Sequence, residues 1–160
     1  IDVLSPVAQE RYYADKLSIL PPSVQALKMV LEQEGVNPKG KSVAVFGSGM
    51  LVGAPIAHWL SRQGANVSVV DERTKNPARI SGEADIVISG VGKPGLITGD
   101  MVQDGAIVID YGYAKKKGSM VGDVDFDSVL PKASLITPVP GGMGPLVIAA
   151  MLENLATAVK

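Results

Sequence analysis

The chain has 160 residues, which suits one domain with a single hydrophobic core. Its 15 basic and 16 acidic residues give a net charge of -1, so nothing favours binding to nucleic acid or to an anionic membrane. It contains no cysteine and one histidine, His58, which excludes disulfides and leaves no set of zinc ligands. No apolar stretch approaches the roughly 20 residues of a membrane span and no signal segment opens the chain, so we expect a cytoplasmic protein.

The apolar residues are mostly aliphatic. Hydrophobic residues make up 46% of the chain and aromatic residues only 4%, a mixture typical of doubly buried parallel strands and the helices that cover them. The sequence starts with Ile1 instead of Met, and residues 1–20 have mixed polarity. We therefore expect a piece of a longer protein.

The first half of the chain alternates between helical and strand patterns. Apolar residues recur at helical spacing from Ser23 to Glu34, and Gly35 would end that helix. Asn76 and Pro77 predict the start of a later helix, with Asn76 as its N-cap. Between these helices we expect a strand at 42–46, a glycine-rich turn at 47–53, a helix at 52–63 and a strand at 67–70.

The second half continues the same alternation. We expect strands at 85–89, 106–110 and 134–136, helical turns near 98–102 and 125–130, an exposed loop at 111–118, a glycine- and proline-rich loop at 138–145, and an apolar helix at 146–159. Strands that alternate with helices through short connections predict the α/β fold class. The expected architecture is a doubly wound, Rossmann-like parallel sheet in a single domain.

A glycine-rich segment lies between the first strand and the next helix, where a phosphate-binding turn is expected. Its residues are Gly47, Ser48, Gly49, Met50, Leu51, Val52 and Gly53. The first glycine permits a tight turn, the second lets the backbone approach a pyrophosphate, and the third lets the helix pack closely on the sheet. Free N–H groups at the helix start attract the anion. The alternative is a glycine-lined turn that binds nothing, because fold alone does not establish function.

Asp71 ends the second strand, some 24 residues after Gly47, which is about where a carboxylate holds the adenosine ribose. A carboxylate there repels a 2′-phosphate, so Asp71 and its neighbour Glu72 favour NAD over NADP. Arg73 and Lys75 could attract that phosphate if Asp71 points elsewhere. Asp71 could also be a solvated turn residue.

Short blocks of distinctive sequence follow one another along the chain. They are Gly53-Ala54-Pro55, Arg73-Thr74-Lys75, Ala84-Asp85-Ile86, Val91-Gly92-Lys93-Pro94-Gly95, Thr98-Gly99-Asp100-Met101-Val102, Val108-Ile109-Asp110, Val121-Gly122-Asp123-Val124-Asp125-Phe126, Thr137-Pro138-Val139-Pro140-Gly141-Gly142 and Gly144-Pro145. In this order and spacing they resemble the methylenetetrahydrofolate dehydrogenase/cyclohydrolase family. By this resemblance, residues 21–160 form the dinucleotide-binding domain and residues 1–20 the hinge segment before it.

The resemblance implies a catalytic N-terminal domain, absent from this sequence, with a folate substrate in the cleft between the two domains. It implies hydride transfer from 5,10-methylenetetrahydrofolate to NAD, or less readily NADP, with cyclohydrolase activity open, in a homodimer formed through the cofactor domains. The tyrosine and lysine that activate the folate belong to the missing domain. We therefore expect the fragment alone to be nearly inactive and to hold no catalytic residue. Tyr12 and Lys16 share the spacing of that pair but lie too close to Gly47 to be it.

The resemblance assigns cofactor contacts to three segments. The pyrophosphate turn corresponds to Ser48, Gly49, Met50, Leu51 and Val52, the loop beside the adenosine and nicotinamide to Val91, Gly92 and Pro94, and the loop against the nicotinamide to Thr137, Gly141, Gly142 and Met143. The family commonly has Arg-Ser at positions 48–49, and its NADP-using members often have His-Ser at 71–72. Both departures favour NAD.

Other positions concern the cleft. Tyr111-Gly112-Tyr113 stands where the family usually has Val-Gly-Ile, and Val147 replaces a common threonine. Asp123 fits a turn or capping residue at least as well as a substrate contact. The three lysines at 115–117 fit a solvated loop, with polyglutamylated folate as an alternative acidic partner.

Two other functions stay open from the sequence. The domain could be a noncatalytic nucleotide-binding or assembly module. It could also be the cofactor domain of an amino-acid or shikimate-type dehydrogenase, which explains the glycine turn but not the blocks between residues 91 and 145.

Overall fold

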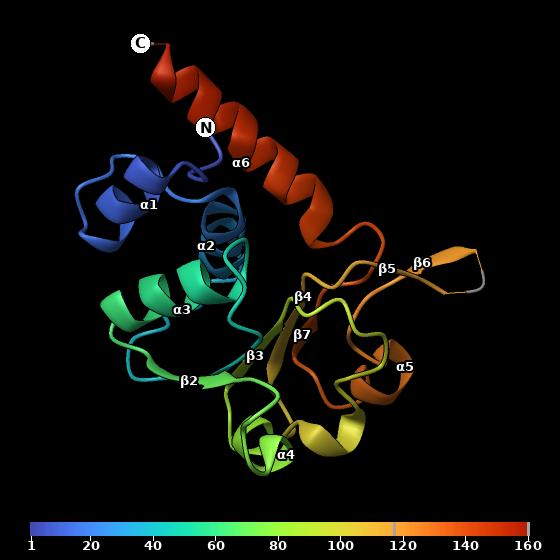
Figure 1. Cartoon of the computed structure of the whole chain (residues 1–160). Coiled ribbons are helices and arrows are strands. Elements are labelled where there is room, and N and C mark those ends of the chain that lie inside the picture. The colour runs from blue at the N-terminus through green and yellow to red at the C-terminus, as the bar shows by residue number, and fades with distance from the viewer. Residues whose placement is uncertain (117, 160) are drawn as a thin grey trace.

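Five parallel strands form the central sheet of the computed structural model, which describes residues 1–116 and 118–159 (Figure 1). The strands lie in the order β2-β1-β3-β4-β7, and every neighbouring pair is parallel. Their bounds are β1 Ser42–Phe46, β2 Asn66–Val70, β3 Ile86–Ser89, β4 Ile107–Asp110 and β7 Leu135–Ile136. The predicted α/β class, with a Rossmann-like parallel sheet, is confirmed.

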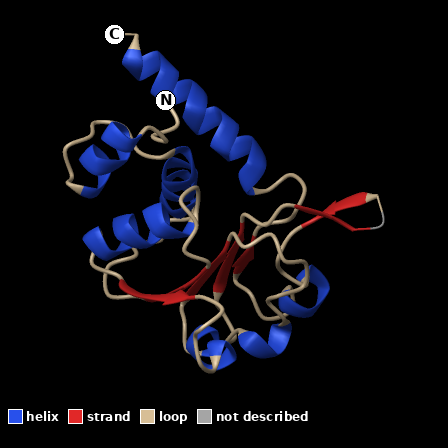
Figure 2. Cartoon of the chain, in the orientation of Figure 1, coloured by secondary structure: helices blue, strands red, loops and turns tan. Residues whose placement is uncertain are grey.

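Helices cover both faces of this sheet (Figure 2). The helices α1, α2, α3 and α6 lie on one face, and α4, η1 and α5 lie on the other (Figure 1). Their bounds are α1 Pro6–Tyr13, α2 Pro22–Gln33, α3 Gly53–Arg62, α4 Pro77–Gly82, the 3-10 helix η1 Gly99–Met101, α5 Phe126–Val129 and α6 Met143–Ala158. Within the described part of the chain, no helix is both long and apolar enough to span a membrane.

The inner strands are buried on both sides because their side chains alternate between two cores. In β1, Val43 and Val45 belong to the core that α2 and α3 cover, whereas Ala44 and Phe46 belong to the core on the opposite face. The strands β3 and β4 are buried along their whole length as well. Neither face of these strands meets water, which explains the unbroken aliphatic runs in the sequence.

The chain reverses its direction across the sheet between β1 and β3. From β1 it adds β2 on one side, and it then returns to add β3, β4 and β7 on the other side. In doubly wound sheets, ligands bind at such a reversal, outside the carboxyl ends of the strands. The segments that leave β1, β2, β3, β4 and β7 all start at this edge, so the fold brings them together there.

The helix α4 starts at Pro77 with Asn76 at the N-cap position, as predicted, but the backbone of Asn76 is left-handed (φ 55°) and its side chain makes no capping hydrogen bond. The start of the last helix differs from the prediction. The helix α6 begins at Met143 and not at residue 146. The N–H of Gly142 bonds to the carbonyl of Pro138 at 2.9 Å and closes the preceding loop early. Pro145 then falls in the first turn of the helix, where proline is tolerated.

The exposed loop predicted at residues 111–118 is only partly correct: Tyr113, Lys115 and Gly118 are exposed, but part of the segment is a strand. Ala114–Lys116 and Ser119–Val121 form the strands β5 and β6 of an antiparallel hairpin, which projects from the domain (Figure 2). Before the hairpin, Gly112 is buried and the side chain of Tyr111 packs against the core. A lysine-rich segment without apolar alternation carries no strand signal, so pairing between its two arms decides the structure. Lys117 lies outside the described residues.

Residues 1–20 contain a helix, α1, that the sequence pattern did not predict. Ser5 caps this helix by accepting a hydrogen bond from the N–H of Ala8 at 3.2 Å. Tyr12 is buried, and its hydroxyl donates to the carbonyl of Pro55 in α3 at 2.8 Å. Tyr12 therefore fastens α1 to the domain, and the hinge role of this segment stays a prediction.

Candidate functional site

The glycine-rich turn after β1 leads directly into α3. Gly47 has a φ of 92°, a region that favours glycine, and its N–H bonds to the carbonyl of Val70 at 2.8 Å. A methyl group on Gly53 would overlap the carbonyl oxygen of Gly47. Glycine at both positions is therefore required for α3 to begin this close to the end of β1.

The turn presents backbone donors that have no partner in the protein. Among the residues that the structure describes, no amide from 48 to 53 donates a hydrogen bond. Ser48, Gly49, Met50 and Leu51 are exposed, and the first turn of α3 contains no acidic side chain. Free N–H groups at a helix start carry a partial positive charge and bind phosphate oxygens. The chemistry of the turn therefore fits a pyrophosphate.

Asp71 lies at the carboxyl end of β2, next along the sheet from the turn. Its Oδ1 accepts hydrogen bonds from the N–H of Arg73 at 2.9 Å and from the hydroxyl of Thr74 at 3.0 Å. These bonds, the Arg73 N–H foremost, hold the pKa of Asp71 below its ordinary value. Asp71 is thus an exposed, ionised carboxylate in a fixed orientation, and Glu72 and Arg73 beside it are exposed as well.

The loop that follows β3 packs against the glycine turn. A methyl group on Gly90 would lie 2.6 Å from Val52 Cγ1, and one on Gly47 would lie 3.2 Å from Val91 Cγ2. Val91, Gly92 and Pro94 are exposed beyond this contact. The turn and the loop therefore form one continuous surface at the point where the sheet reverses.

Two buried carboxylates support the loops at this edge. Asp123 accepts hydrogen bonds from the hydroxyl of Ser89 and from the N–H groups of Val91 and Lys93, each at 2.7 Å. Asp110, at the end of β4, accepts three further backbone N–H groups, and burial raises its pKa. The carboxylate of Asp123 therefore holds the loop after β3 in place, in line with its predicted role as a turn or capping residue.

The segment after β7 completes this edge. Thr137 is buried, and its hydroxyl oxygen accepts the N–H of Asp110 at 2.8 Å. Gly141 is exposed, whereas Met143 is buried at the start of α6. A methyl group on Gly142 would overlap the carbonyl oxygen of Pro138, so glycine is needed where this loop turns into the helix.

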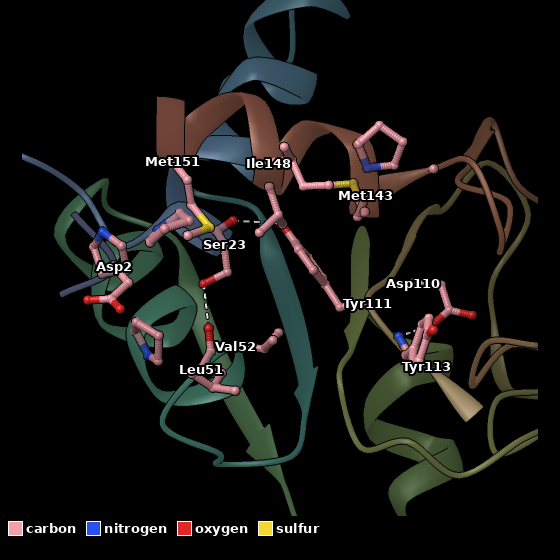
Figure 3. A pocket seen from close by; sticks show the side chains of 18 of the residues that line it. Asp2, Ser23, Leu51, Val52, Asp110, Tyr111, Tyr113, Met143, Ile148 and Met151 are labelled. Carbon is pink, nitrogen blue, oxygen red and sulfur yellow. Dashed lines mark hydrogen bonds between the residues drawn. The ribbon is translucent and has the colours of Figure 1, made fainter. Parts of the chain in front are cut away.

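A cavity of about 700 Å³ opens beside the glycine turn (Figure 3). Its walls come from α1, the start of α2, the turn, residues 111–113, residues 138–145 and α6. In Figure 3, Met143 and Met151 of α6 lie on one side, and Leu51 and Val52 of the turn lie on the other. The volume suits a small molecule, and the walls are mostly apolar.

A pair of hydrogen bonds links two walls of this cavity. The hydroxyl of Tyr111 donates to the carbonyl of Ser23 at 2.7 Å, and the hydroxyl of Ser23 donates to the carbonyl of Leu51 at 2.6 Å (Figure 3). Burial raises the pKa of Tyr111 well above its ordinary value, so its hydroxyl remains a donor. The start of α2 is thereby tied to both the glycine turn and the end of β4.

The residues that the sequence singled out fall into three groups at the same edge of the sheet. The cavity is lined by Met50, Leu51, Val52, Gly141, Gly142 and Met143. A second cavity, of about 550 Å³, is lined by Pro94 and Thr137 and shares Asp110 with the first. Gly47, Ser48, Gly49, Gly53, Asp71, Glu72, Arg73, Val91 and Gly92 line neither cavity, but they belong to the segments that leave β1, β2 and β3.

Four residues that shape this site were given no supporting role by the sequence, although Tyr111 was noted as a cleft position and Asp110 lies in a family block: Ser23, Ser89, Asp110 and Tyr111. A signal existed for two of them, because Ser89 and Asp110 are polar residues at the ends of buried apolar strands. Ser23 and Tyr111 act across long sequence separations, which no local pattern reveals. Among the described residues, no three His, Asp or Glu side chains are grouped as a metal site would need.

Comparison with known proteins places this chain in a family. Residues 21–160 match the family model described as tetrahydrofolate dehydrogenase/cyclohydrolase, NAD(P)-binding domain. The bifunctional protein FolD of Lactobacillus gasseri is 41% identical over 153 residues, which is 96% of this chain and 54% of that protein. The FolD protein of Wolinella succinogenes is 45% identical over 88% of this chain and 49% of its own length. The chain thus spans about half the length of these curated relatives.

Solved structures agree with this assignment. The bifunctional FolD methylenetetrahydrofolate dehydrogenase/cyclohydrolase of Campylobacter jejuni has a TM-score of 0.91 and 37% identity, over 96% of this chain and 55% of that one. The Trypanosoma brucei dehydrogenase-cyclohydrolase, solved with NADP and an inhibitor, has a TM-score of 0.90 and 38% identity, over 98% and 56% of the two chains. The chain belongs to the tetrahydrofolate dehydrogenase/cyclohydrolase family and corresponds to its NAD(P)-binding domain.

Proposed function

We propose that this domain binds NAD in preference to NADP and serves as the cofactor half of a 5,10-methylenetetrahydrofolate dehydrogenase. One observation carries the proposal. The unpaired amides of residues 48–53 and the ionised carboxylate of Asp71 follow neighbouring strands at the reversal of the sheet. That arrangement matches a pyrophosphate and an adenosine ribose on one ligand.

The remaining contacts would come from the loops at the same edge. Val91, Gly92 and Pro94 are exposed beside the turn and are available to the nucleoside portions. Gly141 and Gly142 line the large cavity, where the nicotinamide and the folate would meet. A nicotinamide held there would supply the acceptor for a hydride from the methylene carbon of the folate. The chain's own part is to orient that ring and to exclude water with apolar walls.

The preference for NAD rests on the charge of Asp71. Its low pKa keeps it ionised at neutral pH, and an ionised carboxylate repels a 2′-phosphate. The N–H of Arg73 is already engaged by Asp71, which fixes the carboxylate at the end of β2. A relative from Trypanosoma brucei was solved with NADP, so the proposed preference for NAD rests on this chain's own Asp71 and not on its relatives.

The activity of the whole protein extends this proposal beyond the domain. The curated relatives are named bifunctional, and two of the solved structures are named dehydrogenase/cyclohydrolases. We infer the same dehydrogenase reaction, with cyclohydrolase activity in the same cleft, once the remaining part of such a protein supplies the groups that activate the folate. The expected homodimer has a candidate surface in β2, an edge strand that exposes Val69.

Calorimetric titration of this chain with NAD and with NADP tests the proposal. We expect NAD to bind more tightly than NADP. Asp71→Ala should weaken NAD binding by about tenfold and reduce the difference in affinity between the two cofactors. Asp100→Ala is the matched control, because Asp100 is also an exposed carboxylate bonded to a threonine hydroxyl but lies outside the site. Binding of neither cofactor, or equal effects of the two substitutions, would contradict the proposal.

A further inference from the structure

Two aspartates are buried where the loops leave the sheet, and each uses its carboxylate to bind backbone. Asp110 is 3% exposed and Asp123 is 0% exposed. The Asp110 carboxylate accepts the N–H groups of Gly112 at 2.6 Å, Asp123 at 3.1 Å and Val124 at 2.9 Å. The backbone that presents Asp123 is therefore held by Asp110.

Asp123 in turn holds the loop after β3. Its Oδ2 accepts the hydroxyl of Ser89 and the N–H of Val91, and its Oδ1 accepts the N–H of Lys93. Val91 contacts the glycine turn near Gly47. A continuous path thus runs from the end of β4, through both carboxylates, to the loop that supports the turn.

Two glycines leave room for both carboxylates. A methyl group on Gly122 would overlap the carboxylate of Asp110, and one on Gly112 would overlap Asp123. Each aspartate therefore occupies space that a glycine beside the other one leaves free. The two groups fit only in this mutual arrangement, which fixes the positions of both loops.

We propose that Asp110 and Asp123 act in series as positioning residues for the dinucleotide: Asp110 places Asp123, and Asp123 holds the loop of Val91 and Lys93 so that Val91 lies against the glycine turn. This inference rests on the proposed function, because the turn is the assigned pyrophosphate site. Nucleotide affinity then depends on two residues that do not belong to the glycine turn. Their effects also depend on each other.

Replacement by asparagine is informative because an amide is nearly the same size as a carboxylate but cannot accept on both sides. In Asp123→Asn, an NH2 group faces either the N–H of Lys93 or that of Val91, so at least one bond is lost. Asp110→Asn places an NH2 group against one of its backbone donors in the same way. Each substitution should release the Val91–Lys93 loop.

The experiment is a double-mutant cycle on the dissociation constant for NAD, with amide NMR spectra of the same proteins. Asp123→Asn should weaken binding by about tenfold, since a charge-assisted hydrogen bond is lost, and Asp110→Asn by a similar factor. The double variant should bind about as well as Asp123→Asn alone, because the two residues act on one loop. The amide resonances of Val91 and Lys93 should move in both single variants.

Asp85→Asn is the matched control. Asp85 also accepts a backbone N–H, that of Ser42 at 2.8 Å, but it precedes β3 at the opposite end of the sheet. This control should lower stability without changing NAD affinity or the Val91 and Lys93 resonances. If Asp110→Asn does not fold, Ser89→Ala removes one hydroxyl donor to Asp123 and should still shift both resonances.

Failure of the series arrangement and failure of the proposed nucleotide-binding function would give different results. Independent losses that multiply in the double variant, or unchanged Val91 and Lys93 resonances in Asp110→Asn, would overturn the series arrangement. An unmodified chain that binds no nucleotide would overturn the proposed function, while the resonances of the free protein would still test the positioning of the loop.

Discussion

Substitution of Gly53 by alanine probes the closest contact in the candidate site. The added methyl group would overlap the carbonyl oxygen of Gly47 and lie 2.6 Å from its carbonyl carbon and 3.2 Å from the nitrogen of Ser48. These atoms are backbone and cannot rotate away, so α3 or the turn must shift. Overpacking of a rigid site costs about 2 kcal/mol. For a domain of this size that cost corresponds to a melting temperature lower by about 4–8 °C.

The same shift should also impair nucleotide binding, because it moves the free amides of residues 48–53. We expect Gly53→Ala to weaken NAD binding by about tenfold or more in a calorimetric titration. Two other glycines distinguish the effect of packing from the effect of contact with the nucleotide. A methyl group on Gly49 or on Gly82 would meet nothing within 4 Å. Gly49→Ala should therefore keep its stability but lose affinity, because Gly49 is assigned to the pyrophosphate, whereas Gly82→Ala in α4 should change neither.

The three variants together show whether the turn is tightly packed and whether its backbone contacts the ligand. If Gly53→Ala melts and binds like the unmodified chain, the turn is not as tightly packed as the structure indicates. If Gly49→Ala binds NAD normally, the backbone of the turn does not approach the ligand.

Two further substitutions test the supports of the site. Tyr111→Phe removes the donor to the Ser23 carbonyl and should lower the free energy of unfolding in urea by about 1 kcal/mol; an unchanged midpoint would show that this bond contributes nothing. The N–H and hydroxyl of Ser42 hold the pKa of Asp85 below its ordinary 3.8, so this carboxylate contributes stability above that value and loses it as the pH falls through the folded pKa. The free energy of unfolding of Asp85→Asn should therefore fall less than that of the unmodified chain between neutral pH and about pH 3. Equal falls in the two proteins, measured by urea unfolding at each pH, would contradict this.

The parts of the fold that were predictable are those that local pattern determines. The strands β1, β3 and β4 can be predicted from their aliphatic runs, because both faces of each strand are buried. The glycine turn is readable because glycine is required both by the φ of Gly47 and by the contact at Gly53. Strand alternation then places the turn at the carboxyl edge of a parallel sheet.

The missed parts depend on contacts between distant segments. The helix α1 has weak amphipathic character, and its best signal was the Ser5-Pro6 pair at its start. The hairpin of β5 and β6 is held by pairing between its arms, which composition does not reveal. Asp110 and Asp123 could each be read as a turn residue, and only the fold brings both carboxylates onto one set of loops.

Amide NMR of the isotope-labelled chain during titration with NAD would locate the dinucleotide site. The largest shifts should occur at Ser48–Gly53, at Asp71 and at Val91–Gly92, with no change at Asp100 or Gly82, and NADP should produce the same pattern only at higher concentration. Shifts confined to other segments, or no shifts at NAD concentrations that saturate related dehydrogenases, would contradict a dinucleotide site at this edge of the sheet.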